Sequence, residues 1–186
     1  MRKLSGEEMG RLSVAECKTR PRFPIVVVLE NIRSAYNVGS VFRSADAFFI
    51  ESVYLVGYCA TPPHKEIAKT ALGAELAVPW KHTQRATTAI GELQALGYKV
   101  LAAEQTDAST PLHRLPLLPD QKVAIVFGNE VSGVESDTLQ CCDGCIEIPQ
   151  FGMKHSLNIA TAAGVVLWEL VRNQLQTSSV PHAKEA

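Results

Sequence analysis

The stretch NVGSVFRSADAFF, from Asn37 to Phe49, places an arginine where it could serve chemistry. Apolar side chains recur through it at helical spacing, which predicts an amphipathic helix with one buried face. Arg43 lies nearly opposite that face. It is either aimed at a ligand or a solvated surface residue that pairs with Asp46, three positions further on. The stretch alone leaves both interpretations open.

Polar residues also gather where predicted strands end. Gly128, Asn129 and Glu130 follow the apolar run KVAIVF, in a segment with a glycine at each end. Three other segments are similar: NIRSAYN after VLE, EQTDAST from Glu104 after KVLAA, and QFGMKHSLN after CIEIP. In open α/β sheets, ligands bind beyond the carboxyl ends of the strands. The four segments therefore predict one shared crevice with a ligand site lined largely by backbone.

Several common sites are not indicated. No G-x-G-x-x-G follows a strand, and no G-x-x-x-x-G-K-[ST] or G-x-S-x-G occurs. The five cysteines are an odd number, and CCDGC contains a single C-x-x-C with no second pair of ligands. A zinc site needs about four ligands. We therefore expect reduced thiols and no metal.

The elements that must position these residues alternate along the chain. The predicted strands are 24–30, 52–57, 99–103, 122–127 and 145–149, with a shorter edge strand at LAVPW, 76–80. The predicted helices are 37–49, 64–74, 83–96, 135–142 and 156–176. Continuous apolar strands between helices predict an α/β fold, a mostly parallel sheet with helices on both faces. The three-proline segment 104–121 is predicted to be an irregular, functional loop.

The last predicted helix is apolar or small nearly all round, so we expect it to be buried. Its first turn carries Ser156 and Asn158, and Ser156 alone suggests an N-cap. Free backbone N–H groups there could also bind an anion. Gly164 lies in the helix interior, where glycine is unfavourable by about 1 kcal/mol relative to alanine. That position predicts a close approach of another backbone.

Length and charge suit one domain of 186 residues with a formal net charge of −1. We expect a basic arm at 1–22, the folded domain at 23–176 and a disordered tail at 177–186. No apolar run could span a membrane and no signal peptide is present, which predicts a cytoplasmic protein. A near-neutral chain must bind nucleic acid through a local basic patch. The arm offers one, unless it is a frayed segment: Arg2, Lys3, Arg11, Lys18, Arg20 and Arg22.

Three segments together resemble the motifs of the SpoU/TrmH-type RNA ribose methyltransferases of the SPOUT superfamily. They are NIRSAYNVGSVFRSADAF, VAIVFGNEVSGV and IEIPQFGMKHSLNIATAAGVVLWE, in the family's order. The resemblance covers 24–172. It implies S-adenosylmethionine as methyl donor, the 2′-hydroxyl of a ribose in tRNA or rRNA as acceptor, RNA rather than DNA as partner, a homodimer and a C-terminal trefoil knot. General topological rules would have excluded a knot.

The resemblance also assigns roles to individual residues. The positions that match the family's polar motif residues, and hence a catalytic role, are Asn37, Arg43, Glu130, Ser156 and Asn158. The positions that match the cofactor-binding segments are Gly128, Ile148 and Leu157, together with Ala103 and Glu104. The family's arginine is proposed as a general base, but a charged arginine that fixes a phosphate is physically easier.

Two alternatives stay open. A non-catalytic RNA-binding relative could keep the same fold, although the catalytic positions are all retained here. A SPOUT methyltransferase of another branch could modify a base nitrogen instead of a ribose. The sequence departs from the family at Ile159-Ala160, where a Val-Ser pair is common, and it has a short arm where many relatives carry an RNA-binding domain.

Overall fold

The computed structural model describes residues 1–5, 8, 10, 12–118 and 121–175; the predicted disordered tail lies outside this part of the chain. The strands are β1 (Phe23–Glu30), β2 (Ile50–Val56), β3 (Trp80–Thr83), β4 (Lys99–Ala103), β5 (Thr110–Pro111), β6 (Val123–Phe127) and β7 (Gly144–Glu147). The helices are α1 (Val14–Thr19), α2 (Ala35–Ala47), α3 (Lys65–Ala71), α4 (Ala74–Ala77), α5 (Ala86–Ala95), the 3₁₀ turn η1 (Leu112–Arg114), α6 (Ser136–Cys141) and α7 (Ile159–Gln174).

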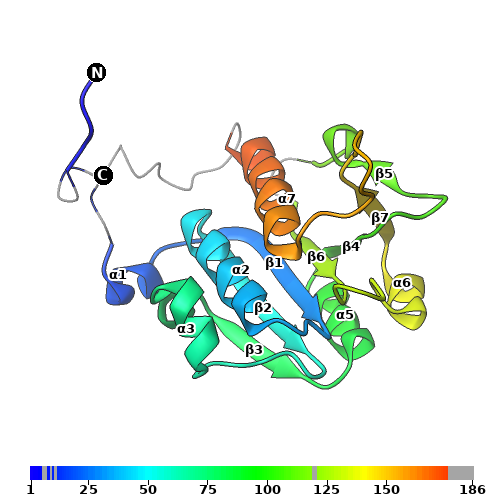
Figure 1. Ribbon diagram of the computed structural model, residues 1–186, viewed down its shortest axis with the longest axis horizontal. Coiled ribbons are helices and arrows are strands. Elements are labelled where there is room, and N and C mark those ends of the chain that lie inside the picture. The colour runs from blue at the N-terminus through cyan, green and yellow to red at the C-terminus, as the bar shows by residue number, and fades with distance from the viewer. Residues whose placement is uncertain (6–7, 9, 11, 119–120, 176–186) are drawn as a thin grey trace.

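The strands form one seven-stranded sheet in the order β3-β2-β1-β6-β4-β7-β5, and all neighbouring strands run parallel (Figure 1). Alternate residues of β1 enter two separate cores. Val27 and Leu29 pack with apolar residues of α2 and α7, whereas Val26 and Val28 pack with those of α5. Both faces of the sheet are therefore covered by helices, which confirms the predicted α/β class.

Two predicted elements differ from the structure around the sheet edges. The short strand expected at LAVPW begins only at Trp80, because Pro79 has no N–H to donate to a neighbouring strand. The segment 104–121 is not wholly irregular. It contains η1 and the two-residue strand β5, which pairs with β7 through Thr110 and Pro111.

The helix predicted at 64–74 is broken. It ends at Ala71 because Leu72 and Gly73 both adopt positive φ, at 53° and 94°, and α4 then starts in a new direction. A positive φ is a common way to end a helix, although Gly is the usual residue there and Leu is not.

Helices α2 and α3 lie side by side (Figure 1) and approach each other most closely at Gly39. A Cβ at that position would lie 2.2 Å from Thr70 Oγ1 and 2.4 Å from the carbonyl oxygen of Ile67. The Thr70 hydroxyl also donates to the carbonyl of Tyr36, at 2.9 Å. Glycine is therefore required here by packing, and this contact fixes α2 in place.

The N-terminal arm is folded over its second half. Helix α1 begins with a capping box between Ser13 and Glu16, and its Cys17 is buried. Arg22 donates hydrogen bonds to the carbonyls of Cys17, Ile50 and Ala77, and its guanidinium lies 4.4 Å from the centre of the Phe49 ring. Arg22 is thus a structural residue and does not belong to a free basic patch. Arg11 lies outside the described residues.

Helix α7 differs from its prediction in two ways. It begins at Ile159, and Asn158 is the N-cap because its side chain accepts from the Ala160 N–H; the interpretation of Ser156 as the cap was wrong. Burial all round was also wrong, since Val165 and Trp168 are exposed. No helix in the described part of the chain has the length and apolar character needed to cross a bilayer.

The predicted close approach at Gly164 is not found among the residues that the structure describes. A Cβ there would meet only Ser44 Oγ, at 4.0 Å, which is an ordinary contact.

We expect Gly39→Ala to lower the free energy of unfolding by about 1–3 kcal/mol, because the added methyl group forces the backbones of α2 and α3 apart. Urea denaturation measures this. Gly91→Ala is the matched control, since a Cβ at Gly91, which lies in α5, would meet no other atom within 4 Å. It should stabilise the protein by up to about 1 kcal/mol. Equal stability of both variants would contradict the packing role of Gly39.

Candidate active site

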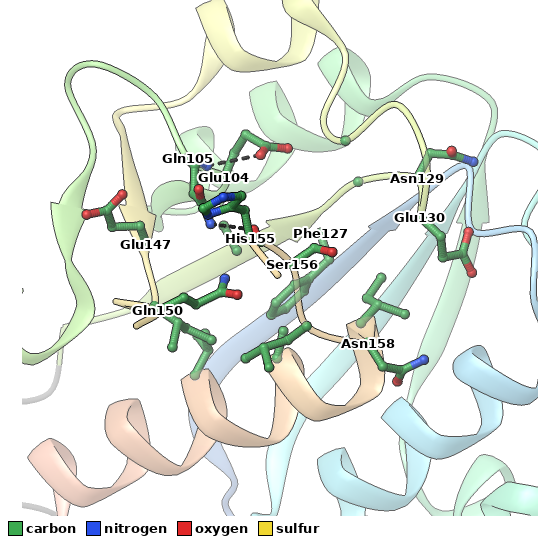
Figure 2. Close-up of a pocket in the computed structure, with 18 of the residues that line it drawn as sticks. Glu104, Gln105, Phe127, Asn129, Glu130, Glu147, Gln150, His155, Ser156 and Asn158 are labelled. Atoms are coloured by element: carbon green, nitrogen blue, oxygen red, sulfur yellow. Dashed lines mark hydrogen bonds between the residues drawn. The ribbon is translucent and has the colours of Figure 1, made fainter. Parts of the chain in front are cut away.

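A cavity of about 460 Å³ lies beyond the carboxyl ends of β4, β6 and β7 and beside the start of α7 (Figure 2). Three of the four segments singled out from the sequence contribute to its lining, so the predicted shared crevice exists. Its apolar lining comes mainly from Phe127, Ile146, Ile148, Leu157, Ile159 and Val166. Figure 2 shows Gln105 and His155 on one side and Glu130 with Asn158 on the other.

All five positions assigned to cofactor binding, Ala103, Glu104, Gly128, Ile148 and Leu157, line this cavity. Gly128 allows the chain after β6 to fold back on itself, because a Cβ there would lie 2.2 Å from the backbone of Gly133 and of Val134. The Glu104 carboxylate accepts from the backbone N–H groups of Val134 and Gln105, each at 3.0 Å. Glu104 therefore lines the cavity and also fixes the backbone of the neighbouring loop at Val134.

Asn129 shapes the same wall and was not assigned a role from the sequence. Its side chain is buried and uses all of its hydrogen-bonding groups. The amide nitrogen donates to the Asn31 carbonyl and to the Tyr58 hydroxyl, and the oxygen accepts from the N–H groups of Val131 and Ser132. The only signal for this role in the sequence was an asparagine just after a predicted strand, where asparagine often stabilises a turn. Asn129 fixes the loop that carries Glu130.

Glu130 joins three parts of the chain at the cavity mouth. Its carboxylate accepts from the backbone N–H groups of Arg33 (2.9 Å) and Ser34 (3.1 Å) and from Nδ2 of Asn37 (2.9 Å). The Asn37 oxygen in turn accepts from Nδ2 of Asn158, at 3.1 Å. Partial burial raises the pKa of Glu130, but these hydrogen bonds outweigh it and hold the pKa below its usual value. The acid is therefore a carboxylate at neutral pH.

Ser156 lines the cavity with an exposed side chain, two residues before the cap of α7. The neighbouring His155 is held by its carbonyl, which accepts from Gln105 Nε2 at 2.8 Å. His155, Gln150 and Glu147 also line the cavity and were not assigned from the sequence. The described residues contain no group of three or more His, Cys, Asp or Glu side chains that could hold a metal ion.

Arg43 is not part of this cavity. It lines a separate, more open hollow between α2 and α7, together with Ser44, Lys69, Val165 and Trp168. The alternative interpretation, an ion pair between Arg43 and Asp46, is not found among the described residues either. Within the described chain, Arg43 is exposed and makes no hydrogen bond or ion pair. Burial raises the pKa of Asp46, and the nearby charge of Arg22 opposes that rise. Of the five positions assigned a catalytic role, Glu130, Ser156 and Asn158 line the cavity, and Asn37 is hydrogen-bonded to two of them without lining it; Arg43 does neither.

Comparison with known proteins adds the following. A family model described as the SpoU rRNA Methylase family matches residues 24–168. The chain is 32% identical over 158 residues to the 23S rRNA (guanosine-2′-O-)-methyltransferase RlmB of Ralstonia nicotianae, covering 85% of this chain and 61% of that protein. It is 30% identical over 152 residues to RlmB of Neisseria meningitidis serogroup B, covering 82% and 60%. The chain thus spans about three fifths of the length of these relatives.

Solved structures have a similar fold. The A. aeolicus TrmH/SpoU tRNA modifying enzyme superposes with a TM-score of 0.77 at 21% identity, over 88% of this chain and 81% of that one. An AdoMet-bound rRNA methyltransferase from Sinorhizobium meliloti gives 0.76 at 26% identity, over 84% and 59%.

The hydrogen bonds to Glu130 predict a pH dependence. A group whose pKa is lowered by folding stabilises the folded state above its unfolded pKa, roughly 4.3, and loses that contribution as the pH falls through the folded value. Wild type should therefore be more stable than Glu130→Gln at pH 7, by no more than about 1 kcal/mol because water competes at this exposed site. The difference should shrink below about pH 4. Urea denaturation of both proteins across this range is the measurement, and a constant difference would contradict the proposed bonding.

Proposed function

Because the chain belongs to the SpoU rRNA methylase family, we propose that it transfers a methyl group from S-adenosylmethionine to the 2′-hydroxyl of a ribose in tRNA or rRNA. One observation carries this proposal: Asn37 is hydrogen-bonded to both Glu130 and Asn158 at the mouth of a cavity whose wall depends on Gly128. The names of the two RlmB relatives, both guanosine-2′-O-methyltransferases, support the ribose over a base nitrogen. We place this activity in the cytoplasm, as the sequence predicts.

The cavity fits a ligand such as S-adenosylmethionine, which joins an apolar-faced adenine to charged groups. Its volume falls within the roughly 300–1,000 Å³ of ligand pockets. Gly128, Ile148 and Leu157 would hold the cofactor, together with Ala103 and Glu104, which line the same cavity. When bound, the cofactor supplies a methyl group already activated on a sulfonium.

The chain's own residues must then orient the ribose and handle its proton. Glu130 is ionised and Asn37 is fixed by bonds on both sides, so these groups offer a rigid polar edge at the cavity mouth. Rigid positioning of reacting groups can account for several kcal/mol of a barrier. Ser156 has an exposed hydroxyl at the same edge and can bind an RNA phosphate or hydroxyl. A charged Arg43 would fix a phosphate and stabilise the developing alkoxide.

We infer that Arg43, which does not line the cavity of its own chain, acts on the cavity of a second copy. We therefore propose a homodimer in which the α2–α7 face, with its exposed Val165 and Trp168, packs on the same face of a partner. A two-fold axis across this face places the later turns of one α2 beside the earlier turns of the partner's helices. That arrangement brings Arg43 toward the partner's Asn37 and Asn158. Close packing of the two copies would also give Gly164 the backbone contact that it lacks within one chain.

The trefoil knot predicted from the resemblance is part of this proposal. In the sheet, the later strands β6 and β7 lie on either side of the earlier strand β4, and this order supports the knot.

The activity is tested by incubating the protein with methyl-labelled S-adenosylmethionine and RNA, followed by mass spectrometry of the nucleosides. Label in 2′-O-methyl nucleosides is expected. Label confined to bases would replace this proposal with the base-modifying branch. Calorimetry on the same preparation should show binding of the cofactor, and its absence would support a non-catalytic relative.

Arg43→Ala should reduce methyl transfer by about 10²-fold or more, the loss expected for a catalytic group, while the affinity for S-adenosylmethionine stays the same. Arg43→Lys should retain part of the activity, because it keeps the charge but not the planar fork. The control is Arg114→Ala, which removes an exposed arginine at η1. Full activity of Arg43→Ala would show that this arginine is an ordinary surface residue.

Mixing two inactive variants tests whether Arg43 acts across the dimer. Asn158→Asp keeps an acceptor for the cap of α7 but removes the Nδ2 donor to Asn37, so its cavity should be inactive. If Arg43 acts on the partner's cavity, heterodimers of Arg43→Ala and Asn158→Asp contain one complete site. Co-refolded at equal amounts, they should recover about a quarter of wild-type activity. No recovery, with heterodimers verified by native mass spectrometry, would place Arg43 and the cavity of one copy in the same site.

A further inference from the structure

A second surface beside the cavity mouth combines positive charge with exposed aromatic rings. It is formed by the loop between β1 and α2, the loop after β2 and the outer side of α3, which lies along α2 (Figure 1). We call it the α3 surface. Its exposed residues are Arg33, Tyr36, Tyr58, His64, Lys65 and Lys69.

The charge of the α3 surface contrasts with that of the whole chain. Residues 31–43 and 57–72 contain four Lys and Arg residues and one carboxylate, Glu66, whereas the formal net charge of the protein is −1. Two further carboxylates border the surface, Glu130 and Glu135. Both already accept hydrogen bonds from this segment, Glu130 from backbone N–H groups and Glu135 from the Asn31 side chain. Counted with these two acids, the Lys and Arg residues outnumber the carboxylates by only four to three, so an RNA backbone would be attracted locally, by the exposed Arg33 and Lys65, and not by a strongly positive field.

The two aromatic rings are held at one end and open to solvent on the rest. The Tyr58 hydroxyl accepts from Nδ2 of the buried Asn129 at 2.7 Å, yet the residue is 62% exposed. Tyr36 is 42% exposed, and the Lys69 ammonium lies 3.5 Å from its hydroxyl and 5.9 Å from its ring centre. A ring whose polar end is already fixed loses little freedom when a base stacks on it. Unpaired bases are what such rings bind in single-stranded RNA.

The α3 surface is continuous with the cavity mouth. Asn129, which holds Tyr58, directly precedes Glu130, and the Arg33 N–H donates to the Glu130 carboxylate. Nucleotides adjacent to a ribose at that mouth would therefore lie over Tyr58 and α3.

We propose that the α3 surface binds the unpaired RNA that flanks the methylated ribose, with Tyr58 stacking on a base and Arg33 and Lys65 contacting phosphates. This inference rests on the proposed function for the position of the ribose. It assigns the main contact with RNA to this surface, whereas the sequence pointed to the N-terminal arm.

The test is fluorescence anisotropy with a short unstructured RNA oligonucleotide and with a duplex of the same length, over a series of salt concentrations. The double variant Arg33→Ala/Lys65→Ala should weaken binding about tenfold or more at low salt and reduce the slope of log K against log salt by about 1.4. The control Lys99→Ala/Lys122→Ala removes the same charge from the opposite, amino-terminal edge of the sheet. It should leave affinity and slope close to wild type.

Tyr58→Leu separates stacking from charge. It should weaken binding of the single strand about 5–150-fold without changing the salt slope, and it should not affect the duplex. Tyr58→Phe keeps the ring and should bind within a few-fold of wild type. Equal losses in Arg33→Ala/Lys65→Ala and in the control Lys99→Ala/Lys122→Ala, or none in either, would overturn the proposal, as would an effect of Tyr58→Leu on the duplex alone.

Binding of S-adenosylmethionine and methyl transfer are measured in the same variants. In Arg33→Ala/Lys65→Ala the cofactor affinity should not change, and KM for RNA should rise while the rate at saturating RNA is retained. If wild type transfers no methyl group, the proposed function fails, but the anisotropy comparison still decides the α3 surface. Wild type that binds no RNA at low salt, or that binds an acidic peptide equally well through these residues, would overturn it.

Discussion

The Glu130 carboxylate accepts three hydrogen bonds from a segment that lies more than 90 residues earlier in the chain. The donors include the backbone N–H of Ser34, the N-cap of α2, where a helix leaves such groups without partners of its own, and the N–H of the preceding Arg33. A negative charge at a helix start is also favoured by the helix dipole. Asn37 extends the same bonding to Asn158 and hence to α7. The mouth of the cavity is thus defined by contacts between three segments and by none of them alone.

Two carboxylates near the ends of the neighbouring strands β1 and β6, one buried and one exposed, have pKa shifts of opposite sign. Glu30, the last residue of β1, is almost fully buried and accepts from the Glu135 N–H and the Thr138 hydroxyl. Burial raises its pKa, whereas the more exposed Glu130 has a lowered one. Glu30 fixes the start of α6, whereas Asn129 and Glu130 form part of the cavity wall. Together the two acids fix both ends of the short chain between β6 and α6.

The strands could be predicted from the sequence because fully buried parallel strands are continuous runs of β-branched residues. The predicted strands for β1, β4 and β6 agree with the structure to within one residue at each end. The break at Leu72 could not be predicted, since leucine in a left-handed conformation depends on the packing of α3 and α4 and not on a local pattern. The cap of α7 was assigned to Ser156 because sequence offers both Ser156 and Asn158, and only the path of the chain after β7 selects one. The cavity residues followed from their positions after strands and from the family resemblance. The position of Arg43 could not be predicted in this way, because a helical pattern shows which face of the helix is buried but not which element lies next to the other face.

Gly39 has a consequence for motion. With no room for even a methyl group between α2 and α3, α2 cannot rotate about its own axis without displacing its neighbour. Asn37 and Arg43 lie on this one helix, the first bound at the cavity mouth and the second on the outer face. The helix therefore moves as one rigid body, which couples the position of Asn37 at the cavity mouth to that of Arg43 in the hollow between α2 and α7. A shift of Asn37 when a ribose enters one cavity would move Arg43 by a comparable amount. In the proposed dimer, this would change the position of Arg43 at the cavity of the partner.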